Sequence, residues 1–183
     1  MGMFCFQCQE TAKGTGCDVR GVCGKTEDVA KLQDLLIYTL KGIADIIKKE
    51  NMDTKELGEV NHKVIESLFM TITNANFDAA ALEKQIDELI SLRDSLKSKA
   101  VSGDFHDAAS YQAGSLEEKL EKAADIGVLS TSDEDIRSLK EMNVYGLKGM
   151  AAYFHHALNL DKDSDEITAY IYDALTATLD DSL

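Results

Sequence analysis

Apolar residues recur every three or four positions along most of the chain after residue 26, the spacing that places them on one face of an α-helix. The clearest stripe begins near Thr26 and ends near Asn51. Its apolar members are Leu32, Leu35, Leu36, Leu40, Ile43 and Ile47. A second stripe, over 78–99, contains Leu82, Ile86, Leu89 and Leu96. The pattern predicts amphipathic helices that face a common core.

Capping residues mark where the other predicted helices begin, because a side-chain oxygen at that position can accept a bond from a free N–H of the first turn. The predicted starts are Asp53-x-x-Glu56 for a helix to about 73, Ser115-x-x-Glu118 for a short helix to about 124, Thr131-x-x-Glu134 for a long helix, and Ser164 for a helix to about 180. The stripe of the long helix is Ile136, Leu139, Leu147, Met150 and Phe154. Proline, the strongest helix breaker, is absent. We therefore expect an all-α fold.

Two of these helices have related sequences. LQDLLIYTLKGIADI at 32–46 aligns without gaps with LKEMNVYGLKGMAAY at 139–153. Leu, Tyr, Leu, Lys, Gly and Ala are identical between them, which indicates an internal repeat. The alignment predicts two consecutive helical bundles, the first of three helices and the second an incomplete repeat. The expected division is a loop at 1–25, a bundle at 26–100, a connector at 101–131 and the incomplete bundle at 132–183.

An incomplete bundle has a consequence for partners. A helical repeat that lacks one member leaves an apolar groove exposed to water. We expect the chain to be a piece of a longer protein, with the remaining domains of that parent or a second copy of the chain covering the groove. The alternative is that the second repeat is simply shorter.

The cysteines are confined to the first 23 residues, as Cys5, Cys8, Cys17 and Cys23. Glycines interrupt this aperiodic segment, so we expect a loop wrapped around a bound group. Iron–sulfur clusters need thiolates delivered by such a loop. Structural zinc is the alternative, but zinc sites usually have two short pairs, and here the second spacing is five residues. The spacing favours an iron–sulfur cluster over zinc. Two disulfides are a poor alternative for a chain that we expect to be cytoplasmic.

Charge and hydropathy exclude several classes of function. The formal net charge of −14 opposes binding to nucleic acid or to an anionic membrane, although it allows a basic electron-transfer partner. No apolar run is long enough to span a membrane, and no secretory signal is visible. We expect a cytoplasmic protein, where thiols stay reduced.

A few other residues have two interpretations each. Lys25 could stabilise an anionic cluster or contact a donor, or it could be an ordinary solvated lysine. Gly42 and Gly149 lie inside predicted helices, which suggests close approach of another helix. For the histidines we expect surface or capping roles rather than metal binding. They are His62, His106, His155 and His156.

The segments FCFQCQETAKGTGC and GVCGK resemble the start of the hybrid cluster proteins, also called prismane proteins or hydroxylamine reductases. The resemblance continues through KLQDLLIYTLKGIA and GVLSTSDEDIRSLKEMNVYGLKGMAAY to ALTATLDDSL, and so covers essentially the whole chain. It implies a helical first domain with two three-helix bundles. By position, the four cysteines match the ligands of the family's N-terminal cubane cluster. Their spacing resembles the subclass with a [4Fe-4S] cluster, and another subclass has a [2Fe-2S] cluster.

The resemblance also sets a limit on activity. The family reduces hydroxylamine or nitric oxide at a separate hybrid cluster, whose further cysteine, histidine and glutamate ligands lie in later domains. This chain has four cysteines, all in the N-terminal motif. We therefore expect no catalytic residues here, and an electron-transfer role from a redox donor protein toward the hybrid cluster. The alternatives are a structural metal-stabilised domain and a partner-binding scaffold.

Overall fold

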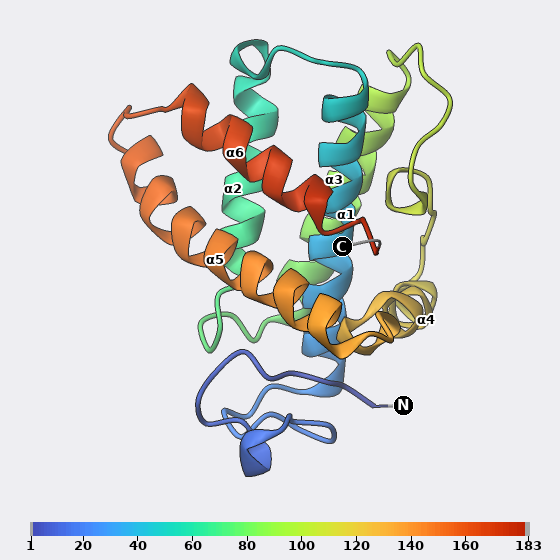
Figure 1. Ribbon diagram of the computed structural model, residues 1–183, viewed down its shortest axis with the longest axis vertical. Helices are drawn as coiled ribbons and strands as arrows, with labels where there is room; N and C mark the ends of the chain where they lie inside the picture. The colour runs from blue at the N-terminus through green and yellow to red at the C-terminus, as the bar shows by residue number, and fades with distance from the viewer. Residues whose placement is uncertain (1, 182–183) are drawn as a thin grey trace.

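The computed structural model describes residues 2–181, and in that part of the chain it contains six α-helices and no β-strand (Figure 1). The helices are α1 (Glu27–Lys49), α2 (Gly58–Met70), α3 (Ala79–Lys97), α4 (Leu116–Ile126), α5 (Glu134–Leu158) and α6 (Asp165–Ala177). Four short 3-10 turns are η1 (Ala12–Gly14), η2 (Thr54–Glu56), η3 (Asp107–Ala109) and η4 (Val128–Ser130). The predicted all-α fold is confirmed.

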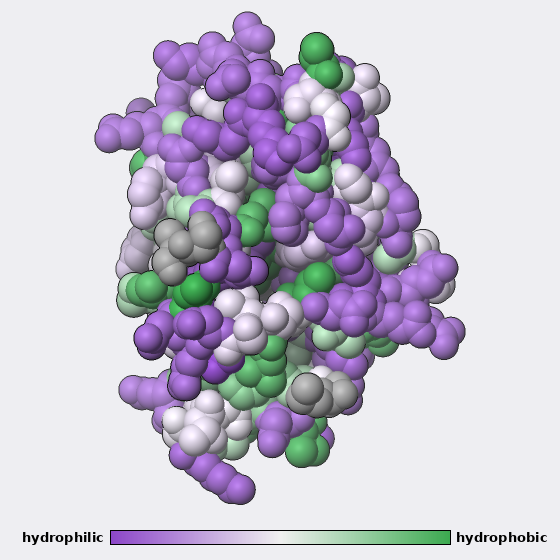
Figure 2. Space-filling view, turned by 45° about the vertical axis from the view of Figure 1, so that its right-hand side comes forward, coloured by the Kyte–Doolittle hydropathy of each residue, from purple (hydrophilic) through white to green (hydrophobic). Residues whose placement is uncertain are grey.

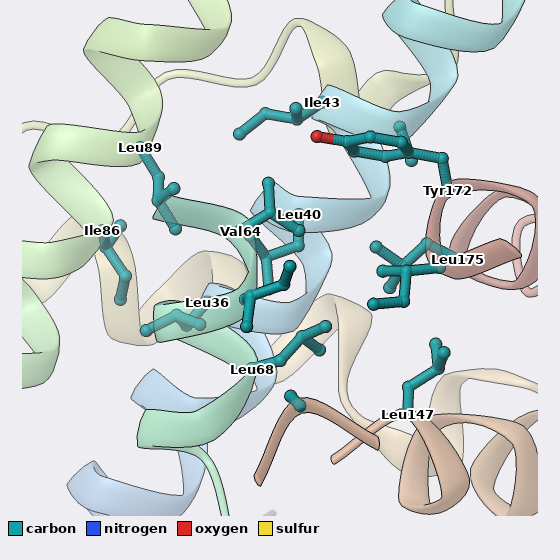
Figure 3. Close-up of a cluster of buried hydrophobic side chains, with 14 of the residues drawn as sticks. Leu36, Leu40, Ile43, Val64, Leu68, Ile86, Leu89, Leu147, Tyr172 and Leu175 are labelled. Carbon is teal, nitrogen blue, oxygen red and sulfur yellow. The ribbon is translucent and has the colours of Figure 1, made fainter. Parts of the chain in front are cut away.

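Helix α1 lies at the centre of the molecule and packs against α3, α6, α4 and η3. Its predicted apolar stripe is buried throughout, as predicted. In Figure 3, Leu36, Leu40 and Ile43 of α1 point into the cluster between α2, α3 and α6. A helix enclosed on several sides buries much of its circumference, which explains why Gln33, Thr39 and Asp45 are buried as well.

The two related halves of the sequence contribute to one hydrophobic core. Helix α5 packs on α2, and α6 crosses α1 (Figure 1). Leu147 and Leu175 belong to the same buried cluster as the α1 residues (Figure 3). The Tyr172 hydroxyl donates to Asn61 Oδ1 at 2.8 Å, which joins α6 to α2 inside that core. The division into segments 1–25, 26–100, 101–131 and 132–183 stays a prediction.

The predicted stripe of α5 is only partly right. Leu147 and Phe154 are buried, but Leu139 is 51% exposed. The buried face consists mainly of Val144, Leu147, Ala151 and Phe154. The elements that α5 contacts are α2, α6 and η4. The opposite side carries Leu139, Met142, Tyr145 and Tyr153, all exposed. Two apolar stripes therefore compete on α5, and the packing partners decide which is buried.

Of the four helix starts predicted from capping residues, two are confirmed and two are wrong. Ser115 and Glu118 form the expected capping box, and Ser164 accepts from the Ile167 N–H. The long helix is capped by Asp133 rather than Thr131, since the Asp133 carboxylate reaches two free N–H groups of the first turn. Asp53 caps only the turn η2, and α2 begins later, at Gly58.

The two glycines of the repeat have different surroundings. A Cβ atom at Gly42 would lie 2.1 Å from the Ala108 carbonyl oxygen, so the backbone of η3 approaches α1 closely there. The predicted close approach at Gly42 is confirmed, although the neighbour is a 3-10 turn and not a helix. At Gly149 the prediction is wrong, because a Cβ atom would have no heavy atom within 4 Å.

The surface is mostly hydrophilic on the face shown in Figure 2, with hydrophobic patches at mid-height and toward its lower end. That end is where Figure 1 places the N-terminal loop. None of the helices in the described part of the chain is long and apolar enough to cross a membrane.

Candidate metal centre

The N-terminal loop brings two of its cysteines together through the backbone. Cys5 N donates to Cys17 O at 3.0 Å, and Cys17 N donates to Cys5 O at 2.8 Å. This isolated antiparallel bridge makes Cys5 and Cys17 neighbours although twelve positions separate them in the chain. A small apolar cluster of Met3, Cys17 and Ala30 then holds the bridge against the first turn of α1. The loop is thus docked on the helix that forms the centre of the fold.

Cys8 begins a hydrogen-bonded turn, and the backbone N–H that follows this turn is directed at another cysteine sulfur. Thr11 donates both its N–H and its hydroxyl to the Cys8 carbonyl, at 3.2 Å and 2.7 Å. The next N–H, that of Ala12, points at the Cys17 sulfur with a distance of 3.5 Å. An N–H directed at a sulfur stabilises its thiolate form, and this is one of the means by which proteins tune bound iron–sulfur clusters.

Cys23 is the exposed member of the set. The chain folds back beside it, since Gly21 N donates to Lys25 O and Gly24 N donates to Gly21 O, both at 2.8 Å. Gly24 has φ of +94°, which glycine adopts without strain. A Cβ atom at Gly21 would lie 3.0 Å from Cys23 Sγ, so the tight return needs glycine there as well.

Four cysteine thiols are the type of donor that an iron–sulfur cluster binds. All four thiols are free, and they range from the buried Cys17 to the exposed Cys23. Within residues 2–181, no three cysteine, histidine or acidic side chains are gathered closely enough to hold one metal ion. A structural zinc ion needs four ligands at about 2.3 Å or less. A cluster binds its thiolates at separate iron atoms, and one loop of this chain carries four cysteines that could supply them.

Lys25 is buried beside Cys5, so the alternative of a solvated lysine is wrong. Its side chain is 3% exposed, and Nζ lies 2.7 Å from Gln33 Oε1 and 4.0 Å from Cys5 Sγ. The Gln33 amide in turn donates to the Asn76 carbonyl at 3.2 Å. An ammonium group is therefore held between α1 and a candidate ligand sulfur.

Sequence reasoning missed a second buried lysine, Lys148 of α5. Its Nζ donates to Gln7 Oε1 at 2.9 Å, and the Thr73 hydroxyl donates to the same oxygen at 3.2 Å. Burial lowers the pKa of Lys148 to about 8, and burial raises the pKa of nearby Asp34 to about 7. The identity of Lys41 and Lys148 in the repeat was the one sequence signal for this position.

Next to the hydrogen bond between Lys148 and Gln7 lies a polar cavity of about 300 Å³ between the loop, α1 and α5. Its charged lining residues are Asp34, Lys41, Arg137, Lys140, Glu141 and Asp181. Burial lowers the pKa of Lys41, opposed in part by Glu141. Side chains of both charge signs therefore line the cavity.

The histidines lie outside the loop. His106 caps η3, since its Nδ1 accepts from the Ala108 N–H at 3.1 Å, which confirms a capping role there. His155 stacks on Phe69 with 4.8 Å between ring centroids, and His156 meets the same ring edge-on. These aromatic contacts assign both rings to the packing of α5 on α2.

Comparison with known proteins gives a match to one family and to several curated relatives. The sequence model of the Prismane/CO dehydrogenase family matches residues 3–183. A protein named hydroxylamine reductase from Acetivibrio thermocellus is 59% identical over 183 residues, which is all of this chain and 34% of that protein. Proteins of the same name from Clostridium perfringens and Desulfitobacterium hafniense are 50% and 52% identical, with 35% and 34% of their lengths covered.

The chain thus spans about a third of the length of these curated relatives. The matched third contains the cysteine loop and all six helices described above. The chain therefore belongs to the Prismane/CO dehydrogenase family.

Proposed function

We propose that this chain is an iron–sulfur electron-transfer domain corresponding to the N-terminal part of a hydroxylamine reductase. Cys5, Cys8, Cys17 and Cys23 would hold a [4Fe-4S] cluster, which accepts and releases single electrons when bound. The observation that carries the proposal is the set of four free thiols on one docked loop, two of them paired through the backbone. Reduction of hydroxylamine or nitric oxide would occur at a hybrid cluster in later domains of a longer parent.

The residues around the loop have separate tasks in this proposal. The thiolates bind, and burial of Cys17 keeps water from its sulfur. The Ala12 N–H stabilises that sulfur, and Lys25 places positive charge beside Cys5. No proton needs to move for an electron to enter or leave, so a rigid loop on a rigid helix is sufficient.

The exposed flank of the loop is where we propose that a redox donor protein docks. Val19 is 82% exposed and Val22 is 61% exposed, on either side of the turn that leads to the exposed Cys23. Exposed apolar side chains are typical of surfaces that contact another protein. Here they would let a donor protein approach the proposed redox centre closely. Figure 2 shows hydrophobic residues at this end of the molecule.

We further propose that the outward face of α5 is covered by another segment of a longer parent chain. In the repeat alignment Leu139, Met142 and Gly149 correspond to Leu32, Leu35 and Gly42. The two leucines of α1 are fully buried, and its glycine lies against η3, whereas the α5 residues are open. The curated relatives are about three times longer than this chain, which supplies candidate segments.

Sedimentation and dye binding together test whether the outward face of α5 is an exposed apolar surface on a monomer. We expect a monomer that binds a hydrophobic dye, with less dye bound by Met142→Asp and unchanged binding by Glu117→Gln on the exposed side of α4. A dimer that Met142→Asp dissociates would instead assign the face to a second copy of the chain. That result would contradict the proposal of an additional segment.

Metal analysis tests the electron-transfer proposal directly. After anaerobic purification we expect about four iron and four sulfide per chain, with a brown chromophore that bleaches on addition of dithionite. About two of each would change the assignment to a [2Fe-2S] cluster. One zinc ion and no colour would contradict the electron-transfer role and leave a structural metal domain.

A further inference from the structure

Lys25 is an unusual buried lysine. Lysine is almost never fully buried without an ionic partner, because its ammonium group loses its hydration. Lys119, another deeply buried lysine, is 1% exposed and pairs with Glu83 and Asp87 at 3.1 Å and 2.7 Å. Lys148 is 3% exposed and donates to Gln7 Oε1, but only Lys25 has a cysteine sulfur as a hydrogen-bond partner among the described lysines. Lys25 forms no such ion pair with any carboxylate among residues 2–181. Its two partners are the Gln33 amide oxygen and the Cys5 sulfur.

The position of Lys25 is fixed from both sides. Gln33 accepts from its ammonium group, and the Gln33 amide is itself anchored on the Asn76 carbonyl of the turn before α3. The Lys25 carbonyl accepts from the Gly21 N–H, so the backbone is held as well. The ammonium group therefore has little freedom to move away from Cys5 when charge near that sulfur changes.

We infer that Lys25 is the positioning residue that raises the reduction potential of the group bound at Cys5, by holding one positive charge against that ligand sulfur. The inference rests on the proposed function above. One electron, supplied by a reductant such as dithionite, adds one negative charge at the site, and no bond forms or breaks. A cation beside that charge favours the reduced form, and burial keeps solvent from screening it. Net charge and hydrogen bonds to sulfur are among the factors that set such potentials.

The test is a redox titration of Lys25→Met in the iron-loaded chain, followed by visible absorption and electron paramagnetic resonance. We expect the ratio of reduced to oxidised protein at a fixed ambient potential to fall at least tenfold, which for one electron is about 59 mV. The control is Arg20→Met, which removes a charge of the same sign from an exposed position in the same loop. Its potential should be nearly unchanged, because exposed charges are screened by salt.

A second variant covers the case in which Lys25→Met does not load iron. Gln33→Glu keeps Lys25 and the loop but places a carboxylate on the ammonium group, so the potential should fall in the same direction. Lys25→Arg, which retains the charge, should restore a value close to that of the unchanged chain. The inference is overturned if neither Lys25→Met nor Gln33→Glu shifts the potential more than Arg20→Met does.

Failure of the proposed function gives a different result. In that case the unchanged chain holds no iron and sulfide, and no potential exists to compare. A chain that loads the full cluster but titrates identically with and without the Lys25 charge rejects the role of Lys25 and retains the electron-transfer role.

Discussion

Replacing Gly42 with alanine is expected to destabilise the fold by about 2 kcal/mol, the difference between an overpacking cost near 3 kcal/mol and a helix-propensity gain near 1 kcal/mol. The new Cβ would lie 2.1 Å from Ala108 O, 2.4 Å from Ala108 C and 2.8 Å from Ala109 N. These are backbone atoms, so no side chain can rotate to make room. The strain must be relieved by moving α1 or the turn η3.

The turn η3 cannot move away freely, because Arg93 holds it. Arg93 is fully buried and donates to the carbonyls of Ala108 and Tyr111, at 3.2 Å and 2.7 Å. Moving η3 outward would break these charge-assisted hydrogen bonds and leave the buried guanidinium with Asp94 alone as its hydrogen-bond partner. This is why we place the overpacking cost of Gly42→Ala at the upper end of its usual range.

Gly149→Ala is the matched control, because it makes the same change at the equivalent position of the repeat. With no heavy atom within 4 Å of the new methyl group, only the helix propensity changes, and stability should rise by about 1 kcal/mol. Thermal unfolding followed by circular dichroism should show melting temperatures about 4–8 °C lower for Gly42→Ala and about 2–4 °C higher for Gly149→Ala. Equal shifts in the two variants would contradict the close approach at Gly42.

The local features of the fold could be predicted from the sequence, and the features set by distant neighbours could not. The α1 stripe and the capping box at Ser115 depend on residues within a few positions, and both are confirmed. On α5, Leu139 and Leu147 are equally apolar, and only the packing on α2 and α6 determines that Leu147 is the buried one. The internal repeat misled the prediction for Gly149, because an equivalent residue need not have an equivalent neighbour.

The candidate site shows the same division. Clustering of the cysteines was sufficient to find the loop, and it required no tertiary information. The backbone bridge from Cys5 to Cys17 and the burial of Lys25 depend on how the loop docks on α1, which no local pattern reports. The bond from Lys148 to Gln7 joins residues 141 positions apart. The periodic pattern of apolar residues cannot predict contacts between residues so far apart in the chain. These contacts nevertheless connect the loop to the second half of the chain.

Removal of the proposed iron–sulfur cluster is expected to free the N-terminal loop and leave the helices folded. The loop is held to α1 by a small cluster of Met3, Cys17 and Ala30, with Cys5 and Ala12 at its edge. The helices share a separate and much larger core that includes none of these residues. A bound group that ties four cysteines together would therefore stabilise the loop selectively, since its binding energy acts on the segment that supplies the ligands.

Hydrogen exchange and circular dichroism measure the two parts separately. After anaerobic chelation, amides of residues 2–25 should exchange on the order of 100-fold faster, the effect of losing about 2.7 kcal/mol of local stabilisation by a ligand. Helical ellipticity should change little, because Leu36, Leu40 and the rest of the α1 core belong to the separate cluster that the helices share. A variant with all four cysteines changed to serine should show the same fast exchange and no response to added iron and sulfide. Loss of helical signal on chelation would instead mean that the loop and the helical core fold as one unit, and that the metal stabilises the whole domain.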